Sequence, residues 1–229
     1  MVLLDRICNH VPHLFPDFLP LRQRGRFMIV VVDYGVGNIA SVLNMLKRVG
    51  AQAKSSNVIA DIEKADKLIL PGVGAFDAGM RTLRESGLVD ILNEQALVVR
   101  KPVMGICLGA QMLGRRSQEG LESGLGWVDM DIIRFEKRDG RKVPHMGWNQ
   151  ISKAQEHPIL SGLDEESRFY FVHSYFMSPD SQQNILLTAD YGERFTAAVV
   201  NDNVFGFQFH PEKSHRFGMQ LFRNFVELI

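Results

Sequence analysis

The chain has 229 residues, and 45% of them are hydrophobic, which suits one large α/β domain with a substantial core. Lys plus Arg and Asp plus Glu both number 26, and this zero net charge argues against nucleic-acid and membrane-surface partners, which favour a basic excess. The two cysteines, Cys8 and Cys107, lie in unlike contexts that do not form a disulfide framework. Their usage predicts a reducing, cytoplasmic compartment.

The first 27 residues differ from the rest of the chain. They combine three prolines with three closely spaced arginines, and their only apolar start is interrupted by Asp5 and Arg6. No apolar run in the chain approaches the roughly 20 residues that span a bilayer, and no signal-peptide cleavage site follows. We expect an irregular N-terminal extension over residues 1–27, or a misassigned start, with a transit peptide as the weaker alternative. The folded domain is predicted to occupy residues 28–229.

The first half of the domain alternates apolar strands with amphipathic helices. "FMIVVVDY", "DKLILPG" and "KPVMGI" are runs typical of strands buried on both faces. Helical spacing follows in "NIASVLNMLKRVGA", which Gly50 is expected to end, in a long helix over residues 76–97, and in a helix beginning "LGAQMLGRR". This alternation predicts a central, mostly parallel sheet with helices on both faces.

The second half changes to short β-type runs joined by turns. These are "GWVDMDIIRF", "RFYFVHSYFM", "NILLTADY", "FTAAVVND" and "VFGFQFHPE". We expect them to add antiparallel strands to the same sheet, and "FGMQLFRNFVELI" to close the chain as an amphipathic helix. No repeat, linker or second core is visible, so a single α/β domain is predicted.

A glycine-rich turn follows the first strand. In "GVGNIA", the residues Gly35, Gly37 and Ala40 match the dinucleotide fingerprint, which also needs a carboxylate about 20 residues later. The sequence there reads "AKSSN" and has none. We therefore interpret the turn as structural and predict no NAD, with Asn38 either capping the helix or contacting something docked at this edge.

Cys107 lies between two glycines where a strand is predicted to pass into a helix. Gly105-Ile106-Cys107-Leu108-Gly109 has the pattern of a nucleophile elbow, a strained turn that presents its central side chain at the carboxyl end of a sheet. The helix N-terminus favours a thiolate, and the N–H of Leu108 is placed to donate to an oxyanion. A small core residue at a tight turn is the alternative interpretation.

A nucleophilic thiol needs a base and a group that orients the base. "FQFHPEKS" supplies His210 and Glu212, two residues apart near a strand end, so that both can point to one side. His173 is the rival base but lacks a neighbouring carboxylate. No Cys/His cluster accompanies His210, so no metal site is predicted. A second oxyanion donor is expected from Pro71-Gly72-Val73-Gly74, where glycines allow unusual peptide orientations.

In this chain order, the Gly-x-Cys-x-Gly elbow, the later His-Pro-Glu and the preceding Pro-Gly-x-Gly turn resemble the triad-type (class I) glutamine amidotransferases. "VPHMGWN" and "FYFVHSY" are more specifically similar to the glutaminase subunits of imidazole glycerol phosphate synthase. The resemblance covers essentially all of residues 28–229. It implies one class I amidotransferase domain that needs no cofactor.

The resemblance also implies a role for each matching residue. Cys107 would attack the side-chain amide of L-glutamine, His210 would protonate the departing ammonia, and Glu212 would orient His210. Val73 and Leu108 would supply the oxyanion hole, after a flip of the Gly72–Val73 peptide. The expected glutamine pocket is lined by Gly72, Gly74, Gln111 and the backbone of His173, Ser174 and Tyr175.

A partner is implied as well. In this family the ammonia passes across a subunit interface into a (β/α)8-barrel cyclase, and the two subunits form a heterodimer. The matching interface positions are Asn38, Trp148, Asn149 and Lys213. Without the family resemblance, Trp148 would be interpreted as an ordinary core aromatic and Lys213 as a solvated charge.

Three features depart from the histidine-pathway pattern. Residues 1–27 have no counterpart, and Ala110 and His215 stand where other residues are expected. An alternative is therefore a paralogous glutaminase that supplies another synthase, such as one that adds an amidino nitrogen to a bacterial surface sugar. A peptidase would keep the triad but would not explain "VPHMGWN", and a non-catalytic scaffold would not need the triad.

Overall fold

The computed structural model describes residues 27–136, 138 and 141–229. Apolar runs form the parallel centre of its main sheet, as the sequence predicts, because both faces of these strands are covered. The parallel strands, in spatial order, are β2 (Gln52–Ser56), β1 (Met28–Val32), β3 (Lys67–Gly72), β4 (Val103–Cys107) and β13 (Val204–Phe207).

The second half continues the same sheet with mostly antiparallel pairs, which confirms the predicted fold class. Beyond β13 the order runs through β12 (Arg194–Asn201), β10 (Tyr175–Pro179), β6 (Met130–Arg134) and β5 (Arg116–Ser117), and only the last pair is parallel. Two further strands, β11 (Ile185–Asp190) and β8 (Ser152–Lys153), pair beside β12.

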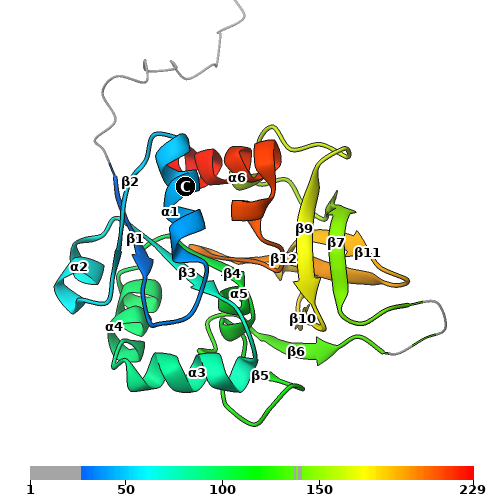
Figure 1. Ribbon diagram of the computed structural model, residues 1–229, viewed down its shortest axis with the longest axis horizontal. Helices are drawn as coiled ribbons and strands as arrows, with labels where there is room; N and C mark the ends of the chain where they lie inside the picture. The colour runs from blue at the N-terminus through cyan, green and yellow to red at the C-terminus, as the bar shows by residue number, and fades with distance from the viewer. Residues whose placement is uncertain (1–26, 137, 139–140) are drawn as a thin grey trace, which may run out of the picture.

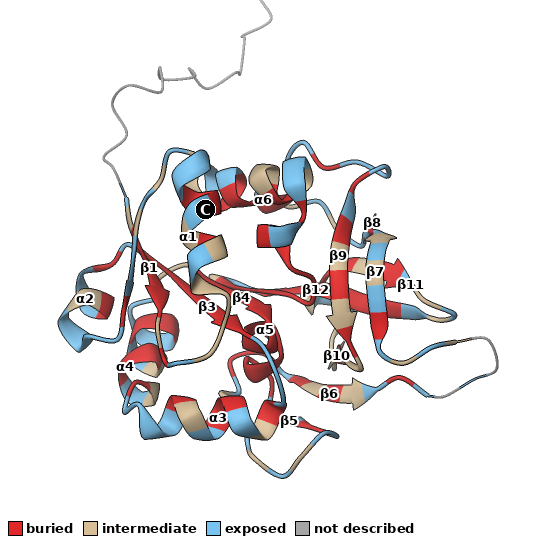
Figure 2. Ribbon diagram, in the orientation of Figure 1, coloured by how far each residue is buried: buried red, intermediate tan, exposed pale blue. Residues whose placement is uncertain are grey.

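Helices cover both faces of the sheet, as Figure 1 shows. On one face lie α1 (Ile39–Arg48) and α6 (His215–Leu228), and on the other lie α2 (Ile59–Lys64), α3 (Phe76–Glu85), α4 (Val89–Asn93) and α5 (Leu108–Met112). Each face has its own apolar core, and the outward sides of the helices are exposed (Figure 2). The helices and the sheet therefore form a three-layer sandwich. In this arrangement ligands bind at the carboxyl ends of the parallel strands.

Two strands stand apart from the main sheet. β7 (His145–Gln150) and β9 (Arg168–His173) pair antiparallel as a separate ribbon beside α6 and β11. The segment predicted as one run, "RFYFVHSYFM", thus divides at Ser174 into β9 of the ribbon and β10 of the main sheet. Sequence analysis did not predict β7, because "HMGWNQ" lacks the β-branched residues that mark a strand.

The predicted long helix over residues 76–97 is wrong as one element. α3 ends at Glu85, Gly87 takes a positive φ of 71°, and α4 begins at Val89, followed by a π-helical segment over Glu94–Val98. Gly87 adopts the left-handed conformation that ends a helix. The helical spacing of apolar residues nevertheless continues across this break, which is why the sequence predicts a single helix. Gly50, with φ of 80°, ends α1 as predicted.

The glycine-rich turn after β1 lies close against Pro71 of β3. Gly37 has a φ of 124°, and a Cβ there would lie 3.0 Å from Cβ of Pro71. β2 ends at Ser56, whose hydroxyl bonds Asp61, so the strand end carries no carboxylate of its own. Asn38 precedes α1, but its side chain makes no capping hydrogen bond.

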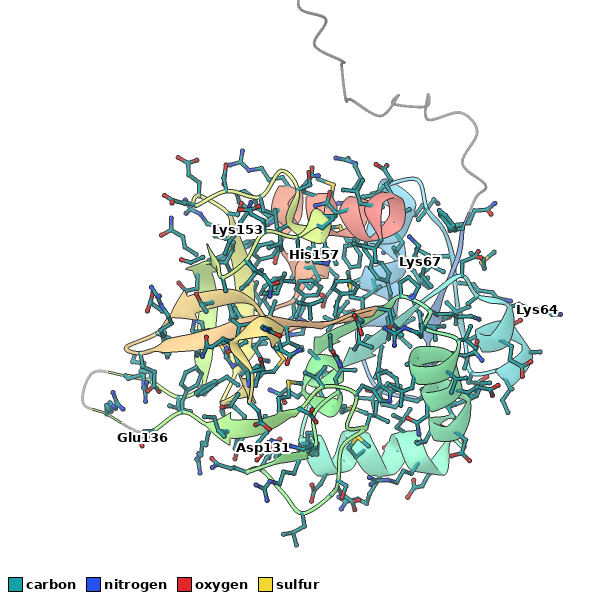
Figure 3. The ribbon with its side chains drawn as sticks, turned by 180° about the vertical axis from the view of Figure 1, so that it is seen from behind. Lys64, Lys67, Asp131, Glu136, Lys153 and His157 are labelled. Atoms are coloured by element: carbon teal, nitrogen blue, oxygen red, sulfur yellow. The ribbon has the colours of Figure 1, made fainter. Side chains whose placement is uncertain are left out.

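A buried lysine joins the start of β3 to the C-terminal end of α6. Lys67, labelled in Figure 3, starts β3 and donates from Nζ to the carbonyls of Phe225, Val226 and Ile229 at 2.6–2.8 Å. A cation at a helix C-terminus satisfies its last carbonyls and opposes the helix dipole.

Within the described residues, no helix is both long and apolar enough to cross a membrane.

Candidate active site

The predicted elbow is confirmed. Cys107 is the last residue of β4, α5 starts at the next residue, and the cysteine has φ of 54° and ψ of −111°. A positive φ is strained for a residue with a side chain, and such strain is typical of functional positions. Cysteine side chains that only fill a core do not need this conformation.

Both glycines of the elbow are required by close backbone approach. A Cβ at Gly105 would lie 2.8 Å from Cα of Ala110, and a Cβ at Gly109 would overlap the carbonyl oxygen of Leu70 in β3. The first glycine therefore makes room under the turn, and the second lets α5 start directly against the sheet.

His210 and Glu212 form a buried pair beside Cys107. Nδ1 of His210 lies 2.8 Å from Oε1 of Glu212, and both side chains are almost completely inaccessible to solvent. The short turn Pro211–Lys213 brings the two side chains to the same side, and the N–H of His210 is fixed by the carbonyl of Tyr170 at 2.9 Å. The geometry is that of a base with an orienting carboxylate.

The charge state of His210 follows from these contacts. Burial lowers its pKa, but hydrogen bonds to Cys107 and to Glu212 outweigh burial and raise the pKa to about 9. The ring is therefore an imidazolium at neutral pH. A buried imidazolium in the same cavity as Cys107 can give a proton to a leaving group.

A cavity of about 430 Å³ opens above the elbow. Its lining includes most of the predicted site residues: Val73, Gly74, Cys107, Leu108, Gln111, His173, Ser174, Tyr175, His210 and Lys213. Gly72 lies beneath it, paired with Cys107 across β3 and β4, and Glu212 lies behind His210. Segments from four separate parts of the chain thus meet at the carboxyl edge of the parallel strands.

The two residues predicted to supply the oxyanion hole, Leu108 and Val73, both line this cavity. Leu108 is the first residue of α5, so its N–H has no acceptor inside the helix. Val73 follows the last residue of β3, its side chain is exposed, and Gly74 beside it has a φ of 97°. The loop therefore has the conformational freedom that a peptide flip requires.

Gln111 is placed by two internal bonds. Its Nε2 donates to the carbonyl of Tyr175 at 3.0 Å and to Oε1 of Gln208 at 3.1 Å. Both amide hydrogens are used, so only its oxygen is left for a ligand. Gln111 thus fixes the pocket wall as well as lining it.

His173 is unsuited to the role of rival base. Nδ1 lies 2.8 Å from the carbonyl of Tyr175 and Nε2 lies 3.0 Å from Nδ1 of His145, so both ring nitrogens are occupied. Burial is the main cause that lowers its pKa to about 3. His210 is the histidine that faces Cys107.

Glu119 is a cavity residue that sequence analysis missed. It lies in the loop after β5, lines the cavity, and accepts the N–H of Phe76 at the start of α3 through Oε2 at 2.8 Å. Pro144 and Val172 line the cavity as well. No local motif marks Glu119, because only the packing of the loop on α3 brings its carboxylate to the site.

The four predicted interface residues have different environments. Trp148 is 46% exposed and stacks on His215 at 5.4 Å between ring centroids, so it is not a core aromatic. Lys213 is exposed, with its ammonium 5.8 Å from the ring centroid of Tyr170. Asn149 is half-buried and donates to the carbonyl of Asp190 at 2.9 Å. Asn38 is half-buried at the start of α1.

Metal ligation has no support in the part of the chain that the structure describes. No group of three or more His, Cys, Asp or Glu side chains there has an arrangement able to hold an ion. The cavity lining itself offers the thiol of Cys107, the imidazole of His210, the carboxylate of Glu119 and backbone groups.

Comparison with known proteins decides the family. The sequence pattern of "Glutamine amidotransferase class-I" matches residues 30–228. The chain belongs to the class I glutamine amidotransferases. The elbow, the His210–Glu212 pair and the cavity are therefore found in a class I amidotransferase domain, and the single-domain α/β fold predicted from the sequence is confirmed.

Relatives of this amidotransferase carry a more specific name. The chain is 74% identical over 202 residues to "Imidazole glycerol phosphate synthase subunit HisH 2" of Pseudomonas aeruginosa, which covers 88% of this chain and 100% of that protein. It is 47% identical to the protein of the same name from Methanococcus maripaludis, over 87% of this chain and 99% of that protein.

Solved structures share the amidotransferase fold. A glutamine amidotransferase from Thermotoga maritima superposes with a TM-score of 0.61 at 15% identity, over 82% of this chain and 77% of that chain. PurLQS from the same organism gives a TM-score of 0.67 at 19% identity, over 88% of this chain and 98% of that chain. At these identities the likeness establishes the fold alone.

Proposed function

We propose that this protein is the glutaminase subunit of imidazole glycerol phosphate synthase. It hydrolyses glutamine to glutamate and ammonia, and it passes the ammonia to a cyclase subunit in histidine biosynthesis. One observation carries the proposal: Cys107 stands on a strained elbow and lines one cavity with His210, whose ring is paired with the buried carboxylate of Glu212. The 74% identity to a named HisH subunit supports the specific synthase.

The geometry supports a thioester mechanism. The Cys107 sulfur attacks the side-chain carbonyl carbon of glutamine, and the negative charge moves onto the carbonyl oxygen. His210 gives its proton to the nitrogen, the C–N bond breaks, and ammonia leaves while a γ-glutamyl thioester remains on sulfur. A water molecule, deprotonated by His210, then attacks the thioester, so that glutamate is released and the thiolate and imidazolium are restored.

The oxyanion needs donors at the place where charge develops. The N–H of Leu108 is proposed as one donor, and that of Val73, after the Gly72–Val73 peptide turns, as the other. The freedom at Gly74 favours this turn. A hole that is completed only after the turn would keep the subunit nearly idle until its partner binds.

Substrate binding is assigned to the remaining cavity residues. The backbone of His173, Ser174 and Tyr175, with Gly74, supplies polar groups for the α-carboxylate and side chain of glutamine. Gln111 presents its oxygen, since its amide hydrogens are used internally. Glu119 is the carboxylate of the lining and suits the α-ammonium group of glutamine.

A (β/α)8-barrel cyclase is proposed as the partner, in a heterodimer that shields ammonia from protonation in solvent. Trp148 and Lys213 support a docking surface, because both are exposed and Lys213 also lines the cavity. Asn38 and Asn149 are the other proposed interface residues. A cytoplasmic location, expected from cysteine usage, belongs to the same proposal.

The domain boundary is also a proposal. Residues 1–26 lie outside the described residues, and the family pattern matches from residue 30. We propose that residues 28–229 are sufficient for glutaminase activity. Deletion of residues 1–27 is then expected to leave the thermal midpoint and the partner-stimulated rate unchanged, and a large loss of either would contradict this boundary.

Glutamate release tests the proposed function. Wild type and Cys107→Ala are assayed with glutamine, each with and without the cyclase partner and a ligand for its acceptor site. Strong stimulation of the wild type alone supports the proposal. Labelling of Cys107 by a diazoketone analogue of glutamine without such stimulation would point to the paralogue that serves another synthase. The absence of both would contradict glutaminase chemistry.

A further inference from the structure

Two buried histidines connect the ribbon to the wall of the cavity. His145 of β7 and His173 of β9 are directly paired across the ribbon, and Nδ1 of His145 lies 3.0 Å from Nε2 of His173. Beyond them, Nδ1 of His173 lies 2.8 Å from the carbonyl oxygen of Tyr175, and Nδ2 of Asn149 lies 3.4 Å from Nε2 of His145. The four residues form one continuous chain of polar contacts.

The direction of every bond in this chain is determined. The carbonyl of Tyr175 can only accept, so Nδ1 of His173 carries the proton. Both rings are neutral, because burial lowers the pKa of His145 to about 4 and that of His173 to about 3. A neutral ring has one N–H, so Nε2 of His173 accepts from Nδ1 of His145, and Nε2 of His145 accepts from Asn149.

The amide of Asn149 completes this arrangement. One of its two hydrogens faces Nε2 of His145, and the other is donated to the carbonyl of Asp190 at 2.9 Å. No donor or acceptor along the chain conflicts with its neighbour. Asn149 therefore acts inside the ribbon through His145, whereas Trp148 beside it points to the opposite, exposed face of β7.

Aromatic packing holds both imidazoles in place. The ring of His145 stacks between Phe171, at 4.9 Å, and Tyr191, at 4.0 Å. The ring of His173 packs against Phe135 and Phe195, each at 5.3 Å. Both rings are buried in close aromatic packing, so a displacement of β7 has to be followed by His173 or has to break a buried hydrogen bond.

We propose that Asn149, His145 and His173 form a one-directional hydrogen-bond relay that positions the Tyr175 carbonyl in the wall of the glutamine cavity. That carbonyl also accepts from Gln111, so the relay and the helix that follows the nucleophile meet on one oxygen atom. The three relay members are positioning residues, because their side chains act on the wall and not on the reacting atoms. The inference rests on the proposed function for its effect on catalysis.

The relay begins on the strand that carries the proposed docking surface. Met146 and Trp148 of β7 are 61% and 46% exposed, and they alternate with His145 and Asn149. Among the described strands, β7 pairs only with β9. A protein that binds Met146 and Trp148 can therefore shift β7, and the relay carries that shift to the cavity.

Ring tautomers give a test that is independent of activity. Long-range proton–nitrogen spectra of the ¹⁵N-labelled full chain at pH 7 are expected to show His145 and His173 as neutral Nδ1–H tautomers. Loss of signals in His145→Phe assigns that ring, and Asn149→Ala is expected to move the ring resonances of both histidines. An Nε2–H tautomer or an imidazolium at either position overturns the relay.

Kinetics test the positioning role at saturating cyclase partner. His145→Phe keeps the ring packing but removes both hydrogen bonds, and it is expected to raise the KM for glutamine at least five-fold with kcat within two-fold. Asn149→Ala is expected to raise KM in the same direction, and the two substitutions together are expected to do no more than His145→Phe alone. An unchanged KM, or additive effects, overturns the relay.

A control histidine separates the relay from general histidine loss. His157, labelled in Figure 3, packs on Phe205 and accepts the N–H of Ile159, apart from the cavity lining. His157→Phe is expected to leave KM unchanged, and an equal rise in this variant overturns a specific relay. If wild type releases no glutamate, the proposed function fails, and the tautomer spectra still decide whether the relay exists.

Discussion

At Cys107, the backbone conformation and the position beside His210 distinguish a candidate nucleophile from a cysteine that only fills a core. Its positive φ accompanies the turn from β4 into α5, and His210, whose pKa is raised to about 9, lines the same cavity. The second partner of His210, Glu212, has a buried Oε2 that finds no hydrogen-bond partner among the described residues. The Glu212 carboxylate therefore acts on His210 through a single contact, the 2.8 Å distance between Oε1 and Nδ1 of the ring.

Glu212→Gln tests that contact through the pH dependence of glutaminase activity. Glutamine keeps an acceptor for Nδ1–H but loses the negative charge that stabilises the imidazolium. Because the pKa of His210 is raised to about 9, wild-type activity is expected to fall above that pH as the ring loses its proton. In the variant this alkaline fall is expected about 1 to 3 pH units lower. A pH profile of kcat/KM checks this, and an unmoved alkaline limb would mean that Glu212 only packs against the ring.

Glu119→Gln tests the assignment of the α-ammonium group. The amide can still accept the N–H of Phe76, but a charge-assisted bond to the substrate is lost. Such a bond contributes about 1.5–3 kcal/mol, so the KM for glutamine is expected to rise about 10-fold or more with little change in kcat. Glu122→Gln is the control, since Glu122 pairs with Arg84 outside the cavity lining. Equal KM values in the two variants would contradict the assignment.

Secondary-structure elements were predictable where local pattern and burial agree. Strands β1, β3 and β4 and helices α1 and α6 follow from apolar runs and helical spacing. Prediction from local pattern failed where a single residue, or a strand distant in the sequence, determines the secondary structure. Gly87 breaks an apolar stripe that otherwise continues, and β7 is a strand only because β9 pairs with it.

The candidate site shows the same division. Cys107, His210 and Glu212 lie in short motifs whose spacing alone carries chemical information, so the sequence located them. Glu119 and the His145–His173 contact depend on packing between segments far apart in the chain. Neither has a local signal, and neither was predicted.

Gly109→Ala tests the fit of α5 against the sheet. Helix propensity alone predicts that alanine stabilises the helix by about 1 kcal/mol. The added methyl group would instead overlap the carbonyl oxygen of Leu70 and lie 2.8 Å from its carbonyl carbon, so β3 and α5 must separate. We expect a loss of about 2 kcal/mol or more in the free energy of unfolding, and a displaced Cys107 that reacts more slowly with the diazoketone analogue. Urea unfolding checks the sign, and a stabilised variant would contradict the close approach.

On the scale of the whole molecule, two apolar cores on opposite faces of one sheet hold the site between them. The core that contains Phe171 and Phe195 also encloses the two relay imidazoles. Because both imidazoles are buried in the neutral form, the stability of the domain depends on their protonation. As the pH falls, protonation of these histidines on unfolding is therefore expected to lower the stability of the fold before the carboxylates take up protons.

The sign of this effect follows from the two pKa values. Unfolded histidine has a pKa near 6.5, whereas the folded pKa is lowered to about 4 for His145 and about 3 for His173. Between these limits the unfolded chain binds more protons, so the free energy of unfolding falls as the pH falls from 6.5 towards 4. Each ring contributes a slope of about 1.4 kcal/mol per pH unit, and the two together about 2.7.

His145→Phe is expected to remove about half of that slope, because one of the two titrating rings is lost while the aromatic stack is kept. Urea unfolding of both proteins between pH 4.5 and 7 checks this, and taking their difference cancels the carboxylates that they share. Equal slopes would mean that His145 takes up a proton in the folded protein. A protonated His145 has no acceptor for Asn149, so the relay would then break as the pH falls through about 6.5.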